Sequence, residues 1–123
     1  MPSSRPAALI VEDQPFVGLV ASDILRESGF ETFHACDAAD AAAVLEQHPE
    51  IEVLVTDAAL HGGSDGIELA RCVSQKRPHV QLVVTSAGIA PADVPTGARV
   101  LRKPYASGEL RTLVAAKSLL ADA

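Results

Sequence analysis

Short apolar runs recur along the 123-residue chain, and segments of helical periodicity separate them. Most of the runs are continuous rather than alternating, which is typical of parallel strands that are buried on both faces. They lie at Ala8–Val11, Val53–Val55, Leu82–Val84 and Val100–Leu101. The stretch Glu31–Ala35 mixes polar residues with one Phe and fits an edge strand. The pattern therefore predicts a sheet of parallel strands.

Helices are predicted between these strands. Pro15 suits the first turn of a helix, Gly29 suits its end, and apolar side chains recur between them at Val17, Val20, Ala21, Ile24 and Leu25. Either Asp37 or Asp40 caps a second helix, which ends near His48-Pro49.

Two more helices are expected further along the chain. One runs from about Gly66 to Lys76, and the last includes Leu110, Leu113 and Val114. The segment Ser86–Gly97 contains Pro91 and Pro95, so any helix there is short or irregular. Alternation of strands and helices with right-handed crossovers favours an α/β fold, a doubly wound parallel sheet with helices on both faces.

The length predicts one domain, residues 7–121, after a flexible tail of residues 1–6. Because the chain has no Trp, one Tyr and three Phe, Ala, Val, Leu and Ile must form the core. Cys36 and Cys72 form neither a Cys-x-x-Cys pair nor a metal cluster, and we interpret both as small buried hydrophobic residues.

Charge and hydropathy exclude some classes of partner. The formal net charge of −6 disfavours direct binding to nucleic acid, which needs clustered Lys and Arg. No stretch approaches the roughly 18 apolar residues of a membrane span. The first apolar run begins too soon after Met1 for a secretory signal, so a cytoplasmic location is expected.

Polar residues follow the predicted strands at the edge where doubly wound sheets bind ligands. They are Glu12, Asp13, Asp57, Thr85, Ser86 and Lys103. Each has an ordinary structural explanation by itself, because Asp favours caps and turns, Thr suits strands and Lys often solvates an edge. Their joint placement at one edge is what indicates a site.

The chemistry of this group points to phosphoryl transfer. Two carboxylates about 4 Å apart repel by roughly 4 kcal/mol at an effective dielectric near 20, and a hard cation such as Mg²⁺ would offset this repulsion. Lys103 can place a positive charge on a phosphoryl oxygen, and Thr85 can donate a hydrogen bond to another. Asp57 then remains as a carboxylate nucleophile that forms an acyl phosphate.

Four motifs carry a resemblance to a known family: Leu9–Asp13, Leu54–Asp57, Val83–Ser86 and Lys103-Pro104-Tyr105. In order and spacing they resemble the response-regulator receiver domain of two-component signalling, over essentially the whole chain. The resemblance implies a flavodoxin-like sheet with strand order 2-1-3-4-5. It also implies a phosphorylation-dependent switch without turnover of an external substrate. The phosphoryl donor would be a sensor histidine kinase or a histidine phosphotransfer protein, and the output would be contact with a downstream protein.

The resemblance also implies roles for residues at the motif positions. Asp57 would be the phosphoacceptor. Asp13 would bind Mg²⁺ directly, Glu12 would bind it through water, and the backbone carbonyl of Ala59 would complete the protein's share of the coordination.

Other roles concern the phosphorylated state. Thr85 and Lys103 would bind the phosphoryl oxygens. The small side chain of Ser86 would leave the pocket open, and the Lys103–Pro104 peptide would be cis.

Three features depart from the family pattern. Val100 stands where receivers usually carry an aromatic residue, the loop Ala58–Gly66 lacks the usual proline, and the interval from Thr85 to Lys103 is short. None of them touches the phosphorylation chemistry, but they put in doubt the common output route through the fourth helix.

Other functions remain open on the sequence alone. One is a pseudo-receiver, the same fold used as a docking module that phosphorylation does not control. Another is a phosphohydrolase with an aspartyl nucleophile, although that class needs a second acid at the position of Ala59. A flavin-binding domain is a further alternative, but no Ser/Thr/Gly phosphate loop follows the first strand.

Overall fold

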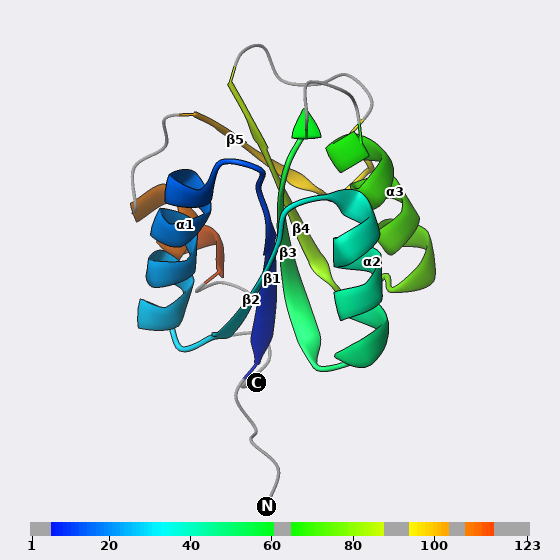
Figure 1. Ribbon diagram of the computed structural model, residues 1–123, viewed down its shortest axis with the longest axis horizontal. Coiled ribbons are helices and arrows are strands. Elements are labelled where there is room, and N and C mark those ends of the chain that lie inside the picture. The colour runs from blue at the N-terminus through cyan, green and yellow to red at the C-terminus, as the bar shows by residue number, and fades with distance from the viewer. Residues whose placement is uncertain (1–5, 61–64, 88–93, 104–107, 115–123) are drawn as a thin grey trace, which may run out of the picture.

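The computed structural model describes residues 6–60, 65–87, 94–103 and 108–114. Its strands form one parallel sheet in the order β2-β1-β3-β4-β5 (Figure 1). The strands are β1 (Ala7–Val11), β2 (Glu31–Ala35), β3 (Ile51–Asp57), β4 (Gln81–Ser86) and β5 (Arg99–Arg102). This arrangement confirms the predicted doubly wound α/β sheet and its flavodoxin-like strand order.

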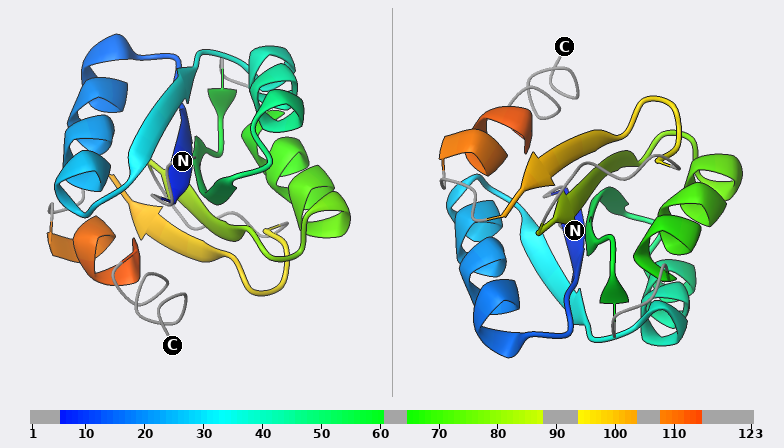
Figure 2. Two further views of the ribbon diagram at one scale, coloured as in Figure 1. Left: turned by 90° about the horizontal axis from the view of Figure 1, so that it is seen from below. Right: turned by 90° about the horizontal axis from the view of Figure 1, so that it is seen from above.

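Helices cover both faces of the sheet (Figure 2). One face carries α1 (Pro15–Glu27) and the helical residues 108–114, and the other carries α2 (Ala38–Gln47) and α3 (Asp65–Lys76). The switch in winding lies between β1 and β3, because the chain first moves outward to β2 and then crosses back past β1. Ligand sites in this class of fold lie at such a point.

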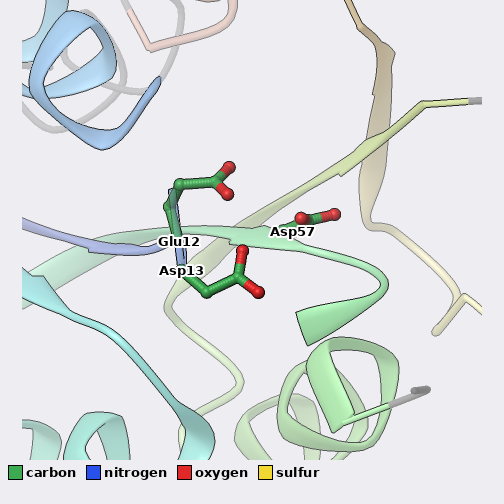
Figure 3. A group of neighbouring side chains, drawn as sticks. All are labelled: Glu12, Asp13 and Asp57. Carbon is green, nitrogen blue, oxygen red and sulfur yellow. The ribbon is translucent and has the colours of Figure 1, made fainter. Parts of the chain in front are cut away.

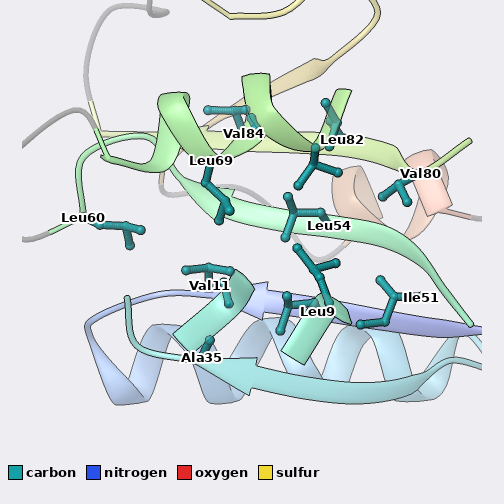
Figure 4. Close-up of a cluster of buried hydrophobic side chains, with 14 of the residues drawn as sticks. Leu9, Val11, Ala35, Ile51, Leu54, Leu60, Leu69, Val80, Leu82 and Val84 are labelled. Atoms are coloured by element: carbon teal, nitrogen blue, oxygen red, sulfur yellow. The ribbon is translucent and has the colours of Figure 1, made fainter. Parts of the chain in front are cut away.

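Each face of the sheet packs into its own apolar cluster. Leu9 and Val11 of β1 point toward α2 and α3, where they meet side chains such as Leu54 of β3 (Figure 4). Ala8 and Ile10 point to the opposite side, toward α1. Both faces of the central strands are therefore buried, which explains why their sequences are continuously apolar.

Local signals set the helix ends as predicted. Pro15 occupies the first turn of α1, and Gly29 follows the helix with a φ of 97° that favours glycine. The carboxylate of Asp37 accepts a hydrogen bond from the amide of Asp40 at 2.7 Å, so Asp37 is the cap of α2.

Arg77 fastens the start of β3, the strand that carries Asp57 at its other end. Its guanidinium donates hydrogen bonds to the carbonyl oxygens of Leu45 (2.8 Å), Pro49 (2.9 Å) and Ile51 (3.1 Å). The side chain thus bonds to carbonyl groups at the end of α2, in the turn that follows it and at the start of β3.

The structure corrects the predicted buried face of α1. Val20 is 45% exposed and lies beside two other exposed side chains, Phe16 (64%) and Leu19 (56%). The helix instead buries Gly18, Ala21, Ser22, Ile24 and Leu25. Gly18 and Ser22 thus replace Val17 and Val20 on the buried face. The reason is that Gly18 is the residue of α1 that faces the ring of His34 on β2.

The predicted burial of the cysteines is also wrong. Cys36 and Cys72 are both exposed free thiols. Cys36 lies just beyond the buried end of β2, and Cys72 lines a surface pocket between α2 and α3, and neither belongs to the two apolar clusters.

Some predictions fall on residues that the structure does not describe. These are most of the tail 1–6, residues 88–93 of the segment Ser86–Gly97, the peptide at Pro104, and the last helix beyond residue 114. The domain bounds of 7–121 stay a prediction. Among the described residues no helix is long and apolar enough to cross a membrane.

Candidate functional site

Three carboxylates meet where β1 and β3 end (Figure 3). Val11 pairs with Thr56 across these neighbouring strands, so Glu12 and Asp57 leave the sheet side by side. One oxygen atom from each of Glu12, Asp13 and Asp57 lies within 4.8 Å of the other two. The predicted acidic cluster therefore exists in the fold.

Lys103 brings a positive charge into this cluster from the far edge of the sheet. Its Nζ lies 2.8 Å from Oε1 of Glu12 and 3.3 Å from Oδ2 of Asp57. Its backbone amide donates to the carbonyl oxygen of Ser86 at 2.7 Å, which fixes the start of the side chain above β4. One ammonium group thus offsets the repulsion between two carboxylates that come from different strands.

The same contacts shift the pKa of Lys103. Burial by itself would lower that pKa, since it disfavours the charged form. The hydrogen bond from Lys103 to Glu12, the negative charges of Asp57 and Glu12, and the hydrogen bond to Asp57 together outweigh burial, so the pKa lies above the ordinary 10.5. Lys103 is therefore firmly cationic at neutral pH.

Backbone donors hold the carboxylates in place. The amide of Ala59 donates to Oδ1 of Asp57 at 3.2 Å, while Oδ2 of Asp57 faces Lys103. The amide of Gln14 donates to Oε2 of Glu12, also at 3.2 Å. Both oxygens of each carboxylate are thereby oriented, so the site is largely formed before any ligand enters.

The backbone of Asp57 is held from below by the first turn of α3. A methyl group on Gly66 would overlap the carbonyl oxygen of Asp57 and come within 2.7 Å of its carbonyl carbon. Only a residue without a side chain lets α3 approach this closely. The hydroxyl of Thr56 also donates to the Asp57 carbonyl at 3.1 Å.

Thr85 lies opposite Asp57 in the register of β3 and β4, and its carbonyl oxygen accepts from the amide of Ala58 at 2.9 Å. Its side-chain oxygen is buried and has no hydrogen-bond partner among the described residues. A buried hydroxyl without a partner is unfavourable, so it is well suited to donate to an oxygen that enters the site.

A pocket of about 350 Å³ opens beside Asp13, Asp57 and Lys103. It is lined by Asp13, Gln14, Asp57, Ala58, Ala59, Ser86, Ala87 and Lys103. The small side chains of Ala59 and Ser86 leave its mouth wide. Val100 lies elsewhere, opposite Val84 on β5 and 37% exposed, and Pro104 falls outside the described residues.

The acidic residues fit a divalent cation. One carboxylate oxygen from each residue lies within 4.8 Å of the other two, so a single cation could contact all three residues, directly or through water. Carboxylate oxygens are the ligands that Mg²⁺ prefers, and Glu12, Asp13 and Asp57 are the residues that would hold it.

Comparison with known proteins decides the family. The family described as response regulator receiver domain matches residues 8–115, which is most of the chain. This chain belongs to that family. Receiver domains in general are signalling switches that interact with histidine kinases or phosphotransfer proteins and typically bind Mg²⁺.

Solved structures of other receiver domains are similar to this one. The receiver domain of NtrX from Brucella abortus is 27% identical with a TM-score of 0.78, and the match covers 91% of this chain and 97% of that one. A longer NtrX chain from the same organism, in complex with ADP, is 26% identical with a TM-score of 0.78; the match covers 95% of this chain but only 26% of that one. A CheY-like protein from Methanospirillum hungatei, 22% identical, shares the fold with a TM-score of 0.82, and the match covers 93% and 94% of the two chains.

Sequence reasoning missed two contacts of this receiver domain's site. His34 on β2 donates from Nε2 to the backbone carbonyl of Glu12 at 3.2 Å, and Gly66 makes room for α3 below Asp57. A signal for the first existed, because Gly18 interrupts a helical pattern and such a glycine usually has a packing reason. The partner that packs there is set by the fold and is not visible in the spacing.

The raised pKa of Lys103 predicts a dependence of stability on pH. A cation whose pKa rises on folding stabilises the protein fully below its ordinary pKa, here 10.5, and that contribution is lost as the pH rises through the folded-state value. We expect Lys103→Gln to lower the free energy of unfolding by about 2 kcal/mol at pH 7 to 9, because it leaves two carboxylates without their cation. Above about pH 10.5 the difference from the parent should shrink.

Urea unfolding without divalent cations, from pH 7 to 11, measures this difference. The exposed Lys76→Gln serves as the matched control, since it removes a lysine outside the site and should show little change at any pH. A deficit of Lys103→Gln that persists undiminished above the folded-state pKa would contradict the assignment.

The close approach of α3 predicts that Gly66→Ala is far more harmful than an ordinary glycine substitution. Since backbone rather than a flexible side chain occupies the space, relief requires a shift of the strand end or of the helix, and we expect a loss of about 2 kcal/mol or more. Gly108→Ala is the control, because nothing lies within 4 Å of the added methyl group. Equal urea midpoints for the two variants would show that α3 does not press on Asp57.

Proposed function

We propose that this receiver domain accepts a phosphoryl group on Asp57 from a phosphohistidine donor, with Mg²⁺ held at Glu12, Asp13, Asp57 and the carbonyl of Ala59. The phosphorylated form then acts through contact with another protein. The observation that carries the proposal is the cluster of carboxylate oxygens within 4.8 Å of one another, with the ammonium of Lys103 against two of them. A cytoplasmic location, expected from the sequence, fits this role.

In the proposed reaction a carboxylate oxygen of Asp57 attacks the phosphorus of the donor. The new bond is a C–O–P acyl phosphate, the bond that breaks is P–N, and the leaving imidazole nitrogen keeps the electron pair and takes up a proton. Bound Mg²⁺ would neutralise charge on the phosphoryl oxygens. Phosphoryl transfer depends mainly on position and charge, and the hydrogen bond from the amide of Ala59 helps to orient the carboxylate of Asp57.

Lys103 and Thr85 would change partners once Asp57 is modified. The ammonium now shared with Asp57 and Glu12 can turn to an oxygen of the phosphoryl group, because that group carries more negative charge than either carboxylate. The hydroxyl of Thr85 gains the acceptor that it lacks among the described residues. Phosphorylation thereby draws Thr85 toward Asp57 at the end of β4.

The proposed switch works without an aromatic toggle. Val100 is small and 37% exposed on β5, so it cannot fill the space that Thr85 leaves. Movement of Thr85 would instead pass to Ser86 and Ala87, which follow it directly in the chain, while residues 88–93 of the predicted switch segment Ser86–Gly97 lie outside the described part. Pro104 and the isomer of its peptide remain a prediction.

Labelling of Asp57 tests the proposal directly. We expect mass spectrometry to show one added phosphoryl group after treatment with acetyl phosphate and Mg²⁺, and none in Asp57→Asn or when Mg²⁺ is chelated. Asp40→Asn removes an exposed aspartate outside the acidic cluster and should label like the parent. Failure of the parent to label with small and protein donors would favour the docking-module alternative, whereas sustained release of phosphate from esters would favour a phosphohydrolase.

The exposed apolar face of α1 is the surface that we propose for the phosphohistidine protein. Phe16 and Leu19 are more than half exposed, and α1 begins two residues after Asp13, so this face borders the entrance to the site. A protein donor has to cover that entrance in order to bring its histidine to Asp57, and exposed apolar side chains next to it favour a helical, apolar partner.

We expect Phe16→Asp to lower the rate of transfer from an autophosphorylated histidine kinase that labels the parent by about tenfold or more. Labelling by acetyl phosphate should stay unchanged, since that donor needs no surface. Ala43→Asp, an equivalent change on the exposed side of α2, is the control. A parallel loss with both donors would mean that Phe16 acts on the site rather than on docking.

A further inference from the structure

His34 lies on β2, the edge strand next to β1, which leads into the acidic cluster. His34 pairs with Ile10 in the register of β1 and β2, so its side chain lies on the face of the sheet that α1 covers. There its Nε2 lies 3.2 Å from the backbone carbonyl oxygen of Glu12. A carbonyl oxygen only accepts, so Nε2 carries the hydrogen in this contact.

The imidazole of His34 also lies close to the backbone of α1 at Gly18. A methyl group on Gly18 would come within 2.7 Å of Nε2 of His34 and 3.2 Å of its Cε1. Glycine is among the least favourable residues in the middle of a helix, yet here it is buried and allows the imidazole to lie against the helix backbone. The space for the ring is therefore a feature of both elements.

The hydrogen bond from His34 is the second one by which β2 fixes the backbone of Glu12. The amide of Glu12 donates to the carbonyl oxygen of Ala35 at 3.1 Å, and its carbonyl accepts from His34. Both backbone groups of the first acidic residue are thus fixed by the same neighbouring strand. The side chain of Glu12 accepts hydrogen bonds from Lys103 and from the amide of Gln14.

We propose that His34, seated on Gly18, is a positioning residue that holds the Glu12–Asp13 backbone in the arrangement that binds Mg²⁺. His34 is no ligand in this proposal, and its charge plays no part, because the bond to Glu12 needs only one N–H. The inference rests on the proposed function, since it assumes that the acidic pair binds the metal. Removal of a group that orients a metal ligand through a hydrogen bond typically lowers metal affinity by about 10- to 100-fold.

The test is the affinity of the unphosphorylated protein for Mg²⁺ alone, measured by isothermal titration calorimetry. We expect His34→Ala to raise the dissociation constant about tenfold or more. His34→Gln should restore most of the affinity, because its amide nitrogen can donate to the same carbonyl without a charge. His79→Ala removes an exposed histidine that precedes β4 at the opposite edge of the sheet, and it should bind like the parent.

Gly18→Ala supplies an independent arm. In the parent background the methyl group should displace the ring, which is the far end of a side chain, and so weaken Mg²⁺ binding as His34→Ala does. In the His34→Ala background the same change should leave the affinity as it is and raise the urea midpoint, because alanine favours a helix more than glycine. A histidine that only packs against α1 would not make the affinity for Mg²⁺ depend on the residue at position 18.

The outcomes separate the inference from the proposed function. If His34→Ala binds Mg²⁺ like the parent while Asp13→Asn loses binding, the positioning role is wrong and the phosphoacceptor site stands. If Gly18→Ala raises the urea midpoint equally in both backgrounds, the imidazole of His34 does not pack against Gly18. The inference is then also overturned. A parent that binds no Mg²⁺ and is not labelled at Asp57 would overturn both.

Discussion

The repulsion between carboxylates at neighbouring strand ends is the constraint on which the rest of this receiver domain depends. Parallel strands all end at the same edge, and here two adjacent ends carry carboxylates at Glu12 and Asp57. The repulsion is offset by Lys103, whose long side chain spans β4 to reach both. The ammonium therefore links the outer strand β5 to the two central strands that carry the site.

Hydrogen bonds from the backbone turn this balance of charges into a defined geometry. Ala59 and Gln14 donate to the carboxylates, while Gly66 and Arg77 fix β3 at its two ends. Among the described residues of the site, the hydroxyl of Thr85 is the buried side-chain group that has no hydrogen-bond partner. The carboxylates that would take part in the reaction are therefore held in fixed orientations. The hydroxyl of Thr85 is the group that a phosphoryl oxygen would supply with a partner.

The sequence was sufficient for the parallel sheet and the acidic cluster, because these depend on patterns that are local to each element, whereas the strand order was implied by the resemblance to receiver domains. Continuous apolar runs mark buried strands, and the residues after them must gather at one edge. It was insufficient for contacts between elements. Val20 was placed on the wrong face of α1 because spacing alone cannot show that the helix meets β2 through Gly18. The cysteines were misplaced because a small thiol fits either environment.

The two tight glycines differ in what their neighbours can tolerate, and this has a consequence for how the sequence can diverge. Gly18 faces a side chain, so a smaller residue in place of His34 would free the position, and the two sites are expected to vary together among relatives. Gly66 faces the backbone of Asp57, which no substitution can make smaller. Its glycine can be exchanged only if the whole first turn of α3 moves, so in evolution this position has no partner that could compensate for it.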